Sequence, residues 1–212
     1  MVTSDFTITS SIDGVALKAR YYRPAAAGTY PVVMIPHGGG GDLTSEAGRA
    51  EAYAQIGYVG VVWSARGHGA PPYDSGGLFD FFGPKTVQDA RDVLDWVLSH
   101  PATGADATHV GITGYSQGGG TTNLVAKTDP RIKAVSPGHT FSGLLESLKP
   151  NGCVKLSVDT VILSAAYLAN KARPDPDLIS RWSAFLSSGQ EIPNASARTS
   201  SKWRNTPRSP SR

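Results

Sequence analysis

The chain has 212 residues, of which 40% are hydrophobic and 17% are charged, a balance typical of one soluble globular domain. Its formal net charge is +3, but residues 192–212 hold five basic residues and no acidic one, so the preceding part, with fifteen basic and seventeen acidic residues, carries about −2. This charge argues against nucleic acid as a partner. The Ser/Arg/Pro-rich end is typical of disorder, with an RNA- or membrane-binding arm as the alternative.

A single cysteine, Cys153, excludes an internal disulfide and favours a reducing compartment, so we expect a cytoplasmic protein. No apolar run reaches the ~18 residues of a membrane span, and the first residues lack the features of a signal peptide. Membranes are therefore not expected as partners. Secretion is the alternative if a leader has been removed. We expect no metal or other cofactor, because the histidines lack ligand spacing and no Lys-Ser/Thr pair follows the glycine run after His37.

The first half of the chain alternates strand-like and helix-like segments. Residues 6–9 and 15–22 alternate apolar and polar side chains around the turn signal Asp13-Gly14, which predicts an antiparallel hairpin. Continuous apolar runs are typical of buried parallel strands, whereas apolar residues at a helical spacing indicate amphipathic helices. Such strands are predicted at 31–36 and 58–63, and helices at 46–56 and 85–99.

The second half continues this alternation and then loses it. Residues 109–113 predict another strand, followed by a helix to about Thr128 and a strand at 132–136. Strands and helices in this order predict a mostly parallel α/β sheet, covered by helices on both faces, with functional residues at the carboxyl ends of its strands. The segments that follow look helical. We therefore predict a sheet core, a helical cap and a disordered tail, over residues 1–139, 140–190 and 191–212.

The most informative segment reads Gly114-Tyr115-Ser116-Gln117-Gly118, between a predicted strand and a predicted helix. This pattern is a nucleophile elbow, in which small residues allow a turn so sharp that the serine backbone is strained. The elbow would expose the hydroxyl of Ser116 above the sheet and aim the Gln117 amide at a developing oxyanion. The alternative is a glycine-rich turn with an ordinary surface serine.

Several motifs, in their order along the chain, together resemble the alpha/beta hydrolase superfamily. The resemblance is carried by Asp13-Gly14, His37-Gly38-Gly39-Gly40, Arg66-Gly67-His68-Gly69, the helix at 89–96 and the elbow. More narrowly, the chain is similar to the X-prolyl dipeptidyl-peptidase and cocaine-esterase-like branch, over roughly residues 5–190. The resemblance implies the alpha/beta-hydrolase fold with a helical cap after the sixth strand.

Carried over residue by residue, the resemblance implies Ser116 as nucleophile and the Gln117 backbone amide as one oxyanion donor. It implies that a second donor is the amide of Gly38 or Gly39, in the loop after the strand at 31–36. Some members of the branch use a tyrosine hydroxyl for that donor. The glycine-rich loop here favours an esterase or lipase-like reaction over a dipeptidyl-peptidase.

The general base that a serine nucleophile needs is not found where the superfamily places it, on loops after two further strands. His139, at the end of the strand at 132–136, is the sole histidine after Ser116, and no strand-like run follows Leu186. We expect a hydrolase truncated near residues 195–210, without its last two strands. His139 as a replacement base or as a pocket wall is the alternative. His37 is expected to order the oxyanion loop rather than to titrate.

The sequence therefore predicts a serine hydrolase for small-molecule carboxylic esters, slow or inactive if the base is missing. A non-catalytic binder of hydrophobic small molecules and a dipeptidyl-peptidase-type serine peptidase are the alternatives. Five aromatic residues are candidates for an apolar substrate pocket, with core packing as the other interpretation: Trp63, Tyr73, Phe81, Phe82 and Phe141. The strand at 132–136 would form an unpaired sheet edge, which favours self-association.

Overall fold

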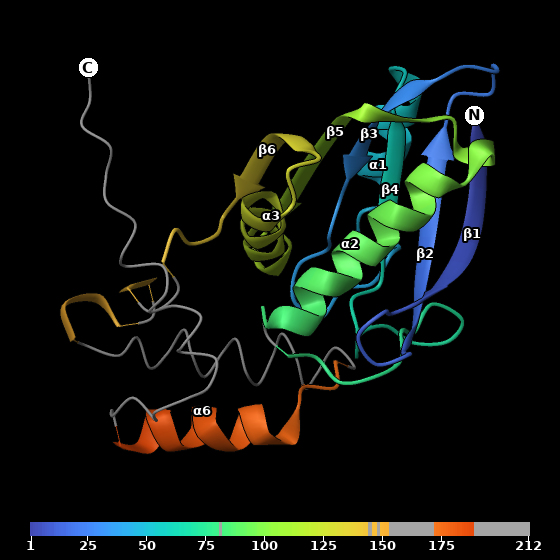
Figure 1. Ribbon diagram of the computed structural model, residues 1–212. Coiled ribbons are helices and arrows are strands. Elements are labelled where there is room, and N and C mark those ends of the chain that lie inside the picture. Colours follow the sequence, from blue (N-terminus) through green and yellow to red (C-terminus); the bar gives the residue numbers. More distant parts are fainter. Residues whose placement is uncertain (81, 144–145, 148, 153–171, 189–212) are drawn as a thin grey trace, which may run out of the picture. The chain divides into compact units, whose positions relative to one another are not determined.

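The computed structural model describes residues 1–80, 82–143, 146–147, 149–152 and 172–188 (Figure 1). The chain divides into two compact units. Met1–Asp175 contains the sheet. Pro176–Arg212 contains helix α6 (Pro176–Ser188), in agreement with the helical pattern of the sequence there.

The first unit is built on a six-stranded sheet with the order β1-β2-β4-β3-β5-β6. The strands are β1 (Val2–Thr9), β2 (Ala16–Arg23), β3 (Tyr30–Met34), β4 (Val59–Trp63), β5 (Ala105–Tyr115) and β6 (Ile132–Gly138). β1 pairs antiparallel with β2, and β2 pairs antiparallel with β4, whereas β3 to β6 run parallel to one another. The loops that follow the parallel strands therefore meet at one edge of the sheet, where functional residues gather in open α/β sheets.

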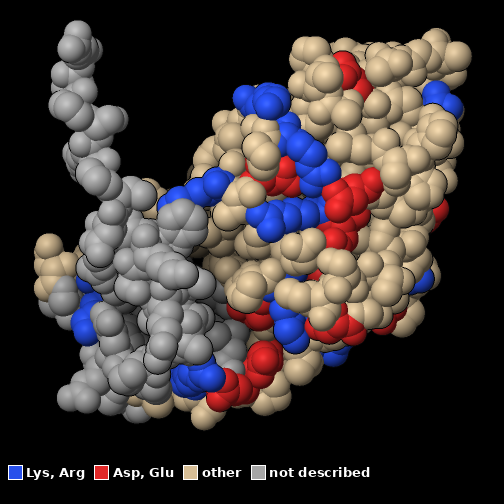
Figure 2. All heavy atoms as spheres, viewed as in Figure 1, with Lys and Arg blue, Asp and Glu red and all other residues tan. Residues whose placement is uncertain are grey.

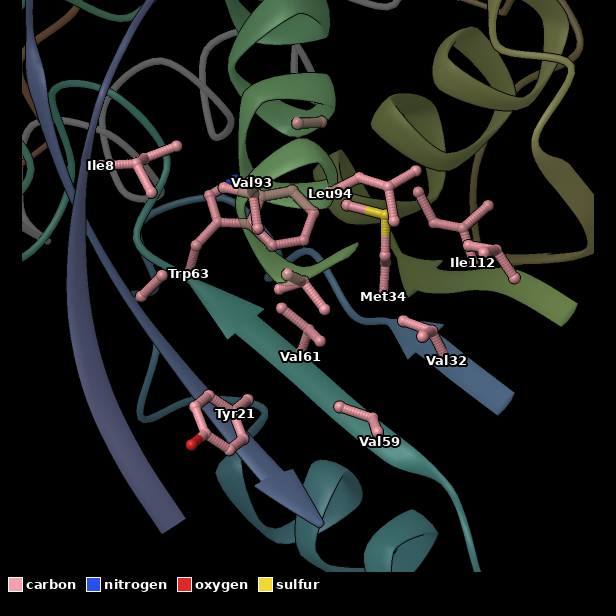
Figure 3. Packing of buried hydrophobic residues seen from close by; sticks show 14 of the residues in the cluster. Ile8, Tyr21, Val32, Met34, Val59, Val61, Trp63, Val93, Leu94 and Ile112 are labelled. Carbon is pink, nitrogen blue, oxygen red and sulfur yellow. The ribbon is translucent and has the colours of Figure 1, made fainter. Parts of the chain in front are cut away.

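Helices α2 (Pro84–Ser99) and α3 (Gln117–Thr128) cover one face of the sheet, in front in Figure 1. Figure 3 shows Val93 and Leu94 of α2 packed over side chains of β3, β4 and β5. All five residues of β4 are buried, as expected for a central strand that is covered on both faces. This packing forms the larger hydrophobic cluster of the described residues.

Helix α1 (Ala47–Gln55) covers the other face, where Ala50 and Ala54 pack against Val33, Ile35 and Val62. A Cβ on Gly60 of β4 would lie 2.5 Å from the Ala50 carbonyl oxygen, so only glycine permits this approach of helix and strand. The two hydrophobic clusters thus hold the sheet between helices on both sides, as the sequence predicts.

A buried arginine ties the first hairpin to α2 and to the loop after β4. Arg66 is 1% exposed and forms two 2.7 Å bonds with the carboxylate of Asp89 in α2, while its Nη1 lies 2.8 Å from Asp13 in the β1–β2 turn. The hydroxyl of Ser10 donates to Asp89 as well, at 2.7 Å. Burial alone would lower the pKa of Arg66, but its bonds to Asp89 and Asp13 more than offset this and raise it. The loop after β4 is therefore anchored by paired charges.

The predicted strands and helices of residues 1–140 are all present, with shifted ends. β1 begins earlier than predicted, because it pairs with β2 in one continuous register from Val2 to Thr9. β5 begins at Ala105 rather than His109, since a register shift against β3 admits exposed polar residues into the strand. The sequence-based strand at 31–36 runs two residues too far, because β3 ends at Met34.

The region after β6 agrees with the sequence only in part. The predicted helical segments around Leu144–Leu148 and at 161–168 lie mostly outside the described residues, as does the predicted tail beyond residue 190. Residues 172–175 are extended rather than helical: Arg173 N–H donates to the Gly67 carbonyl at 2.6 Å, and Phe79 N–H donates to the Arg173 carbonyl at 2.8 Å. This segment forms an isolated parallel bridge, Phe79 to Pro174. It thereby joins the loop after β4.

The outer strand β6 is the least covered strand of the sheet. Within the described residues it pairs with β5 alone, and residues 133–137 are exposed. On the face of the molecule in Figure 2, basic and acidic side chains are interspersed rather than separated by sign. None of the helices in the described ranges is long and apolar enough to cross a membrane.

Candidate active site

Ser116 occupies the turn between β5 and α3, and its backbone is in a strained conformation. Its φ of 54° and ψ of −120° lie where non-glycine residues are rare, at a cost of ~1–3 kcal/mol. The residue is exposed, although it follows a largely buried strand end and precedes a buried helical turn. The Ser116 N–H donates to the Gly138 carbonyl at 3.0 Å, and the Ser116 carbonyl accepts from the Gly120 N–H at 3.0 Å. Both bonds fix the turn.

The glycines on either side of Ser116 are required by close backbone approaches. A Cβ on Gly114 would lie 2.6 Å from the Gly118 carbonyl carbon. A Cβ on Gly118 would collide with the carbonyl oxygen of Pro36, in the loop after β3. Because neither obstacle is a flexible side chain, larger residues cannot fit without movement of the backbone. The elbow and the loop after β3 are therefore packed directly against each other.

The glycine loop after β3 presents unbonded N–H groups beside Ser116. A Cβ on Gly38 would be 3.8 Å from the Cβ of Ser116, so the two residues are close neighbours. The Gly38 carbonyl accepts bonds from the His37 ring at 2.7 Å and from the Gly41 N–H at 3.1 Å. In a trans peptide the next N–H, that of Gly39, points the opposite way, away from these bonds. Neither the Gly38 nor the Gly39 N–H has an acceptor among the described residues.

His37 holds this loop in place. It is 3% exposed; its Nδ1 donates to the Gly38 carbonyl, and its Nε2 accepts from the Ala65 N–H at 2.9 Å. Burial lowers the pKa of His37, against the opposing effect of its bond to Gly38. The imidazole is therefore neutral near neutral pH, with both nitrogens occupied by backbone groups.

Gln117 is the first residue of α3, so its backbone N–H has no acceptor within the helix. This N–H and the positive end of the helix dipole favour negative charge beside the serine. The Gln117 side chain does not point into solvent: the residue is 4% exposed, and its Oε1 has no hydrogen-bond partner among the described residues. The structure thus brings together four of the predicted site residues, namely His37, Gly38, Ser116 and Gln117.

His139 lies close to the elbow in the chain path, since it follows Gly138, whose carbonyl binds the Ser116 N–H. It is exposed, with a φ of 47°, and its ring lies 5.7 Å from the ring of Tyr115 in an edge-on contact. Tyr115 is in turn covered by the Arg49 guanidinium, 4.7 Å from its ring centroid. Among the described residues, the Ser116 hydroxyl has no hydrogen-bond partner, so His139 and Ser116 are neighbours without a direct bond.

The aromatic residues predicted for a pocket lie in different places. Phe82 and Phe141 pack edge-to-face at 5.1 Å, and a Cβ on Gly120 of α3 would meet Phe82 at 2.5 Å. These two rings border the start of α3. Trp63 is 3% exposed in the main cluster, so core packing is the correct interpretation there. The Tyr73 hydroxyl accepts a hydrogen bond from Arg20 Nη2 at 3.2 Å. Phe81 lies outside the described residues.

Three of the four non-glycine described residues with a positive φ, Phe82, Ser116 and His139, border this one site. Strained backbone conformations gather at functional sites. The positive φ of Phe82 could not be predicted from the sequence, since the residues around it show no pattern typical of a left-handed backbone conformation. No cluster of three potential metal ligands occurs in the part of the chain that is described.

Solved structures with similar folds are alpha/beta hydrolases and esterases. The structure of DcsB with its substrate analogue matches 63% of this chain and 44% of its own, with a TM-score of 0.55 and 23% identity. Acetyl xylan esterase 1 from a Thermoanaerobacterium species matches 70% of this chain and 56% of its own, with a TM-score of 0.54 and 20% identity. The alpha/beta hydrolase GrgF from a Penicillium species matches 63% of this chain and 45% of its own, with a TM-score of 0.53 and 20% identity. The chain spans about half the length of these proteins.

The sheet order, the strained serine after β5 and these similarities define an alpha/beta hydrolase fold, which confirms the fold class predicted from the sequence. The model of the X-Pro dipeptidyl-peptidase family, S15, matches residues 13–211, and the chain therefore belongs to that family. A search of curated proteins gives no significant match.

Proposed function

We propose that the protein is a serine hydrolase that cleaves small carboxylic esters through Ser116. The observation that carries the proposal is the strained, exposed Ser116 at the junction of β5 and α3, next to backbone N–H groups of two separate segments. Strain of this kind in a serine between a strand and a helix is the mark of a nucleophile elbow. Structural relatives that are esterases support the same class of reaction.

In the proposed reaction, Ser116 Oγ attacks the ester carbonyl carbon and its proton passes to a general base. The carbonyl oxygen becomes an oxyanion, which the N–H groups of Gln117 and of Gly38 or Gly39 stabilise. Collapse of this intermediate breaks the bond to the alcohol, which leaves with a proton. Water then attacks the acyl-serine, releases the acid and restores Ser116.

His139 is our candidate for the general base, because it adjoins the residue that holds the Ser116 backbone. Its ring would have to leave the Tyr115 contact to reach Oγ, and its exposure leaves room for that movement. Without any base, oxyanion stabilisation and binding alone leave a residual acceleration of about 10³- to 10⁴-fold over water.

Hydrolysis of p-nitrophenyl acetate tests the proposal. Wild type should release p-nitrophenol faster than Ser116→Ala, and His139→Ala should fall to the residual level if His139 is the base. Equal rates for wild type and Ser116→Ala would reject the nucleophile. Binding of p-nitrophenyl acetate without turnover would instead favour a non-catalytic binder.

A peptidase is the second candidate function, since the family match carries the description X-Pro dipeptidyl-peptidase. Amides are harder to cleave than activated esters, so they require a complete base. Release of p-nitroaniline from an X-Pro-p-nitroanilide that depends on Ser116 would favour this function. We expect ester turnover and no anilide turnover, because the second oxyanion donor is a backbone N–H of the glycine loop.

A further inference from the structure

β1 is an outer strand of the sheet, and its outer edge has no partner strand among the described residues. It lies at the opposite end of the strand order from β6 and pairs with β2 alone, residue for residue from Val2 to Thr9 (Figure 1). The strand has no register shift and contains neither lysine nor proline, two residues that commonly protect an edge strand from further pairing. The outer edge of β1 is therefore a regular template for another strand.

Hydrogen bonds around the hairpin show which backbone groups of β1 face outward. The Ser10 N–H donates to the Val15 carbonyl at 2.8 Å, across the hairpin. Because successive residues of a strand direct their backbone groups to alternate sides, the even-numbered residues of β1 bond to β2 and the odd-numbered ones point away from it. The Lys18 carbonyl, opposite Thr7, accordingly bonds on the other side of β2, to the residue after β4 at 2.9 Å. The N–H and C=O groups of Asp5 and Thr7 thus point toward the place of a further strand.

Side chains next to this edge carry complementary charges. Asp5 and Thr7 lie on one face of β1, and a hollow of about 270 Å³ borders both. The Asp5 carboxylate accepts a bond from Arg20 Nη2 at 2.9 Å. The Thr7 hydroxyl accepts from the Lys18 ammonium at 3.2 Å, and no carboxylate pairs with this ammonium within the described residues. A strand that brings a carboxylate opposite Thr7 would supply the counter-charge that Lys18 lacks.

The other face of β1 carries an aromatic ring near the middle of the strand. The Phe6 ring stacks on Trp96 of α2, with 3.7 Å between the ring centroids, and remains partly exposed. Aromatic side chains directly opposite each other on antiparallel strands stabilise the pairing. A strand with its own aromatic residue opposite Phe6 therefore fits this face.

We propose that two copies of this chain pair through β1 in an antiparallel, two-fold symmetric arrangement that joins their sheets. Opposite residues of antiparallel strands direct their side chains to the same face, so odd-numbered residues pair with odd-numbered ones. Centring the pairing on Asp5 would place two carboxylates opposite each other, whereas centring it on Phe6 avoids this. The resulting pairs are Phe6 with Phe6, Asp5 with Thr7, Ser4 with Ile8, and Thr3 with Thr9.

This register satisfies both faces of the strand at once. Each Asp5 lies opposite the Thr7 that holds Lys18 of the second copy, so the two carboxylates meet the two ammonium groups without a carboxylate pair. The two Phe6 rings adjoin at the symmetry axis, each backed by its own Trp96. Asp5 and Thr7 form a hydrogen-bonded pair, in which their outward N–H and C=O groups bond to one another. The pairing does not depend on the proposed function.

Hydrogen exchange of the full chain tests the pairing directly. The outward amides of Asp5 and Thr7 should exchange more slowly as the protein concentration rises through the range in which sedimentation velocity shows dimer. The amides of Phe6 and Ile8 bond to β2 and are the internal control, so their exchange should not depend on concentration. Asp5 and Thr7 amides whose exchange is equally independent of concentration overturn the proposal.

Thr7→Pro tests the same contact by substitution. It removes an N–H that β2 does not use, and proline is tolerated in an edge strand where its nitrogen faces outward, so the variant should fold. Two hydrogen bonds are lost by symmetry, so the Kd of the dimer should rise by about 10- to 100-fold. The matched control Thr7→Val keeps the N–H and should keep most of the dimer. A folded Thr7→Pro variant that dimerises like the wild type overturns the proposal.

Disulfide cross-linking in a Cys153→Ser background tests the register. Phe6→Cys places two thiols opposite each other and should give a covalent dimer on mild oxidation, whereas Thr3→Cys, opposite Thr9, should not. Val135→Lys on the other outer strand should leave the Phe6→Cys cross-link unchanged. A dimer that Val135→Lys abolishes, without a Phe6→Cys cross-link, would lie on β6 and would overturn pairing through β1.

Discussion

The two sides of Ser116 are built very differently within the described residues. On the side of β3 and β4, His37, Arg66 and His68 are at most 3% exposed, and His37 Nε2 accepts the Ala65 N–H of the loop after β4. On the side of β6, residues 133–137 and His139 are exposed. Preorganised donors belong in a dry, rigid setting, and the side that we propose as the oxyanion site has this character, whereas the side of our candidate base does not. Mutations should therefore be costly on the first side and nearly silent for stability on the second.

The largest expected effect is at Arg66. Arg66→Leu leaves the buried Asp89 without its ionic partner, and loss of one partner of a buried pair costs ~3–5 kcal/mol. Urea unfolding measures this loss. The double variant Arg66→Leu/Asp89→Leu removes both charges and should recover part of it. A cost below about 1 kcal/mol for the single variant would show that the β4 side is no more rigid than the β6 side.

Gly118→Ala should be the next most damaging change. The added methyl group collides with the Pro36 carbonyl, and overpacking of this kind costs ~1–3 kcal/mol. Gly48→Ala in α1 is the matched control, because a Cβ there meets nothing within 4 Å. Gly48 lies in the first turn of α1, where alanine fits the helix, so the control should keep or slightly raise stability. Equal changes in the urea midpoint for the two variants would contradict the close contact of elbow and glycine loop.

Acid should weaken the β4 side through Asp13. Its bond with Arg66 lowers the pKa of Asp13 to about 2 from its ordinary 3.8. A carboxyl with a lowered pKa contributes stability that is fully present above the unfolded pKa. This contribution is lost as pH falls from about 4 to about 2. Asp13→Asn should therefore reduce the fall in thermal midpoint over that window. An unchanged pH dependence in the variant would mean that Asp13 is not paired in solution.

The smallest effect on stability is expected on β6. Val135 is 47% exposed, so Val135→Lys should change the unfolding free energy by less than about 0.5 kcal/mol. If β6 edges pair between molecules, as we propose from the exposed strand, the added charge should shift the protein toward monomer in sedimentation velocity. A wild type that is already monomeric at high concentration would reject self-association through this edge.

The difference between the two sides also explains what could be predicted from the sequence. The elbow around Ser116 is local: its strand, turn and helix adjoin in the chain, and its glycines are required by steric contacts that any such turn creates. The apolar runs of β3 and β4 were equally informative, because a strand buried on both faces needs them. The mostly parallel sheet and its two covering layers followed from the alternation of these runs with helices, whereas the order of the strands in the sheet did not.

Long-range contacts could not be predicted in the same way. Residues 172–175 pair with Phe79 across almost a hundred positions, and a segment with Pro174 carries no strand pattern. The bond between the Ala65 N–H and His37 Nε2 joins two loops that have no common motif. Aromatic composition could not tell whether Trp63 faces a pocket or the core, since both environments favour the same side chain.

The central claim is that Ser116 is an activated nucleophile, and labelling with a fluorophosphonate tests it most directly. Intact mass should show one adduct on the folded wild type and none on Ser116→Ala, because the reagent reacts with a serine whose oxyanion site and base are in place. A folded wild type that stays unlabelled, or a Ser116→Ala variant labelled to the same extent, would contradict the account.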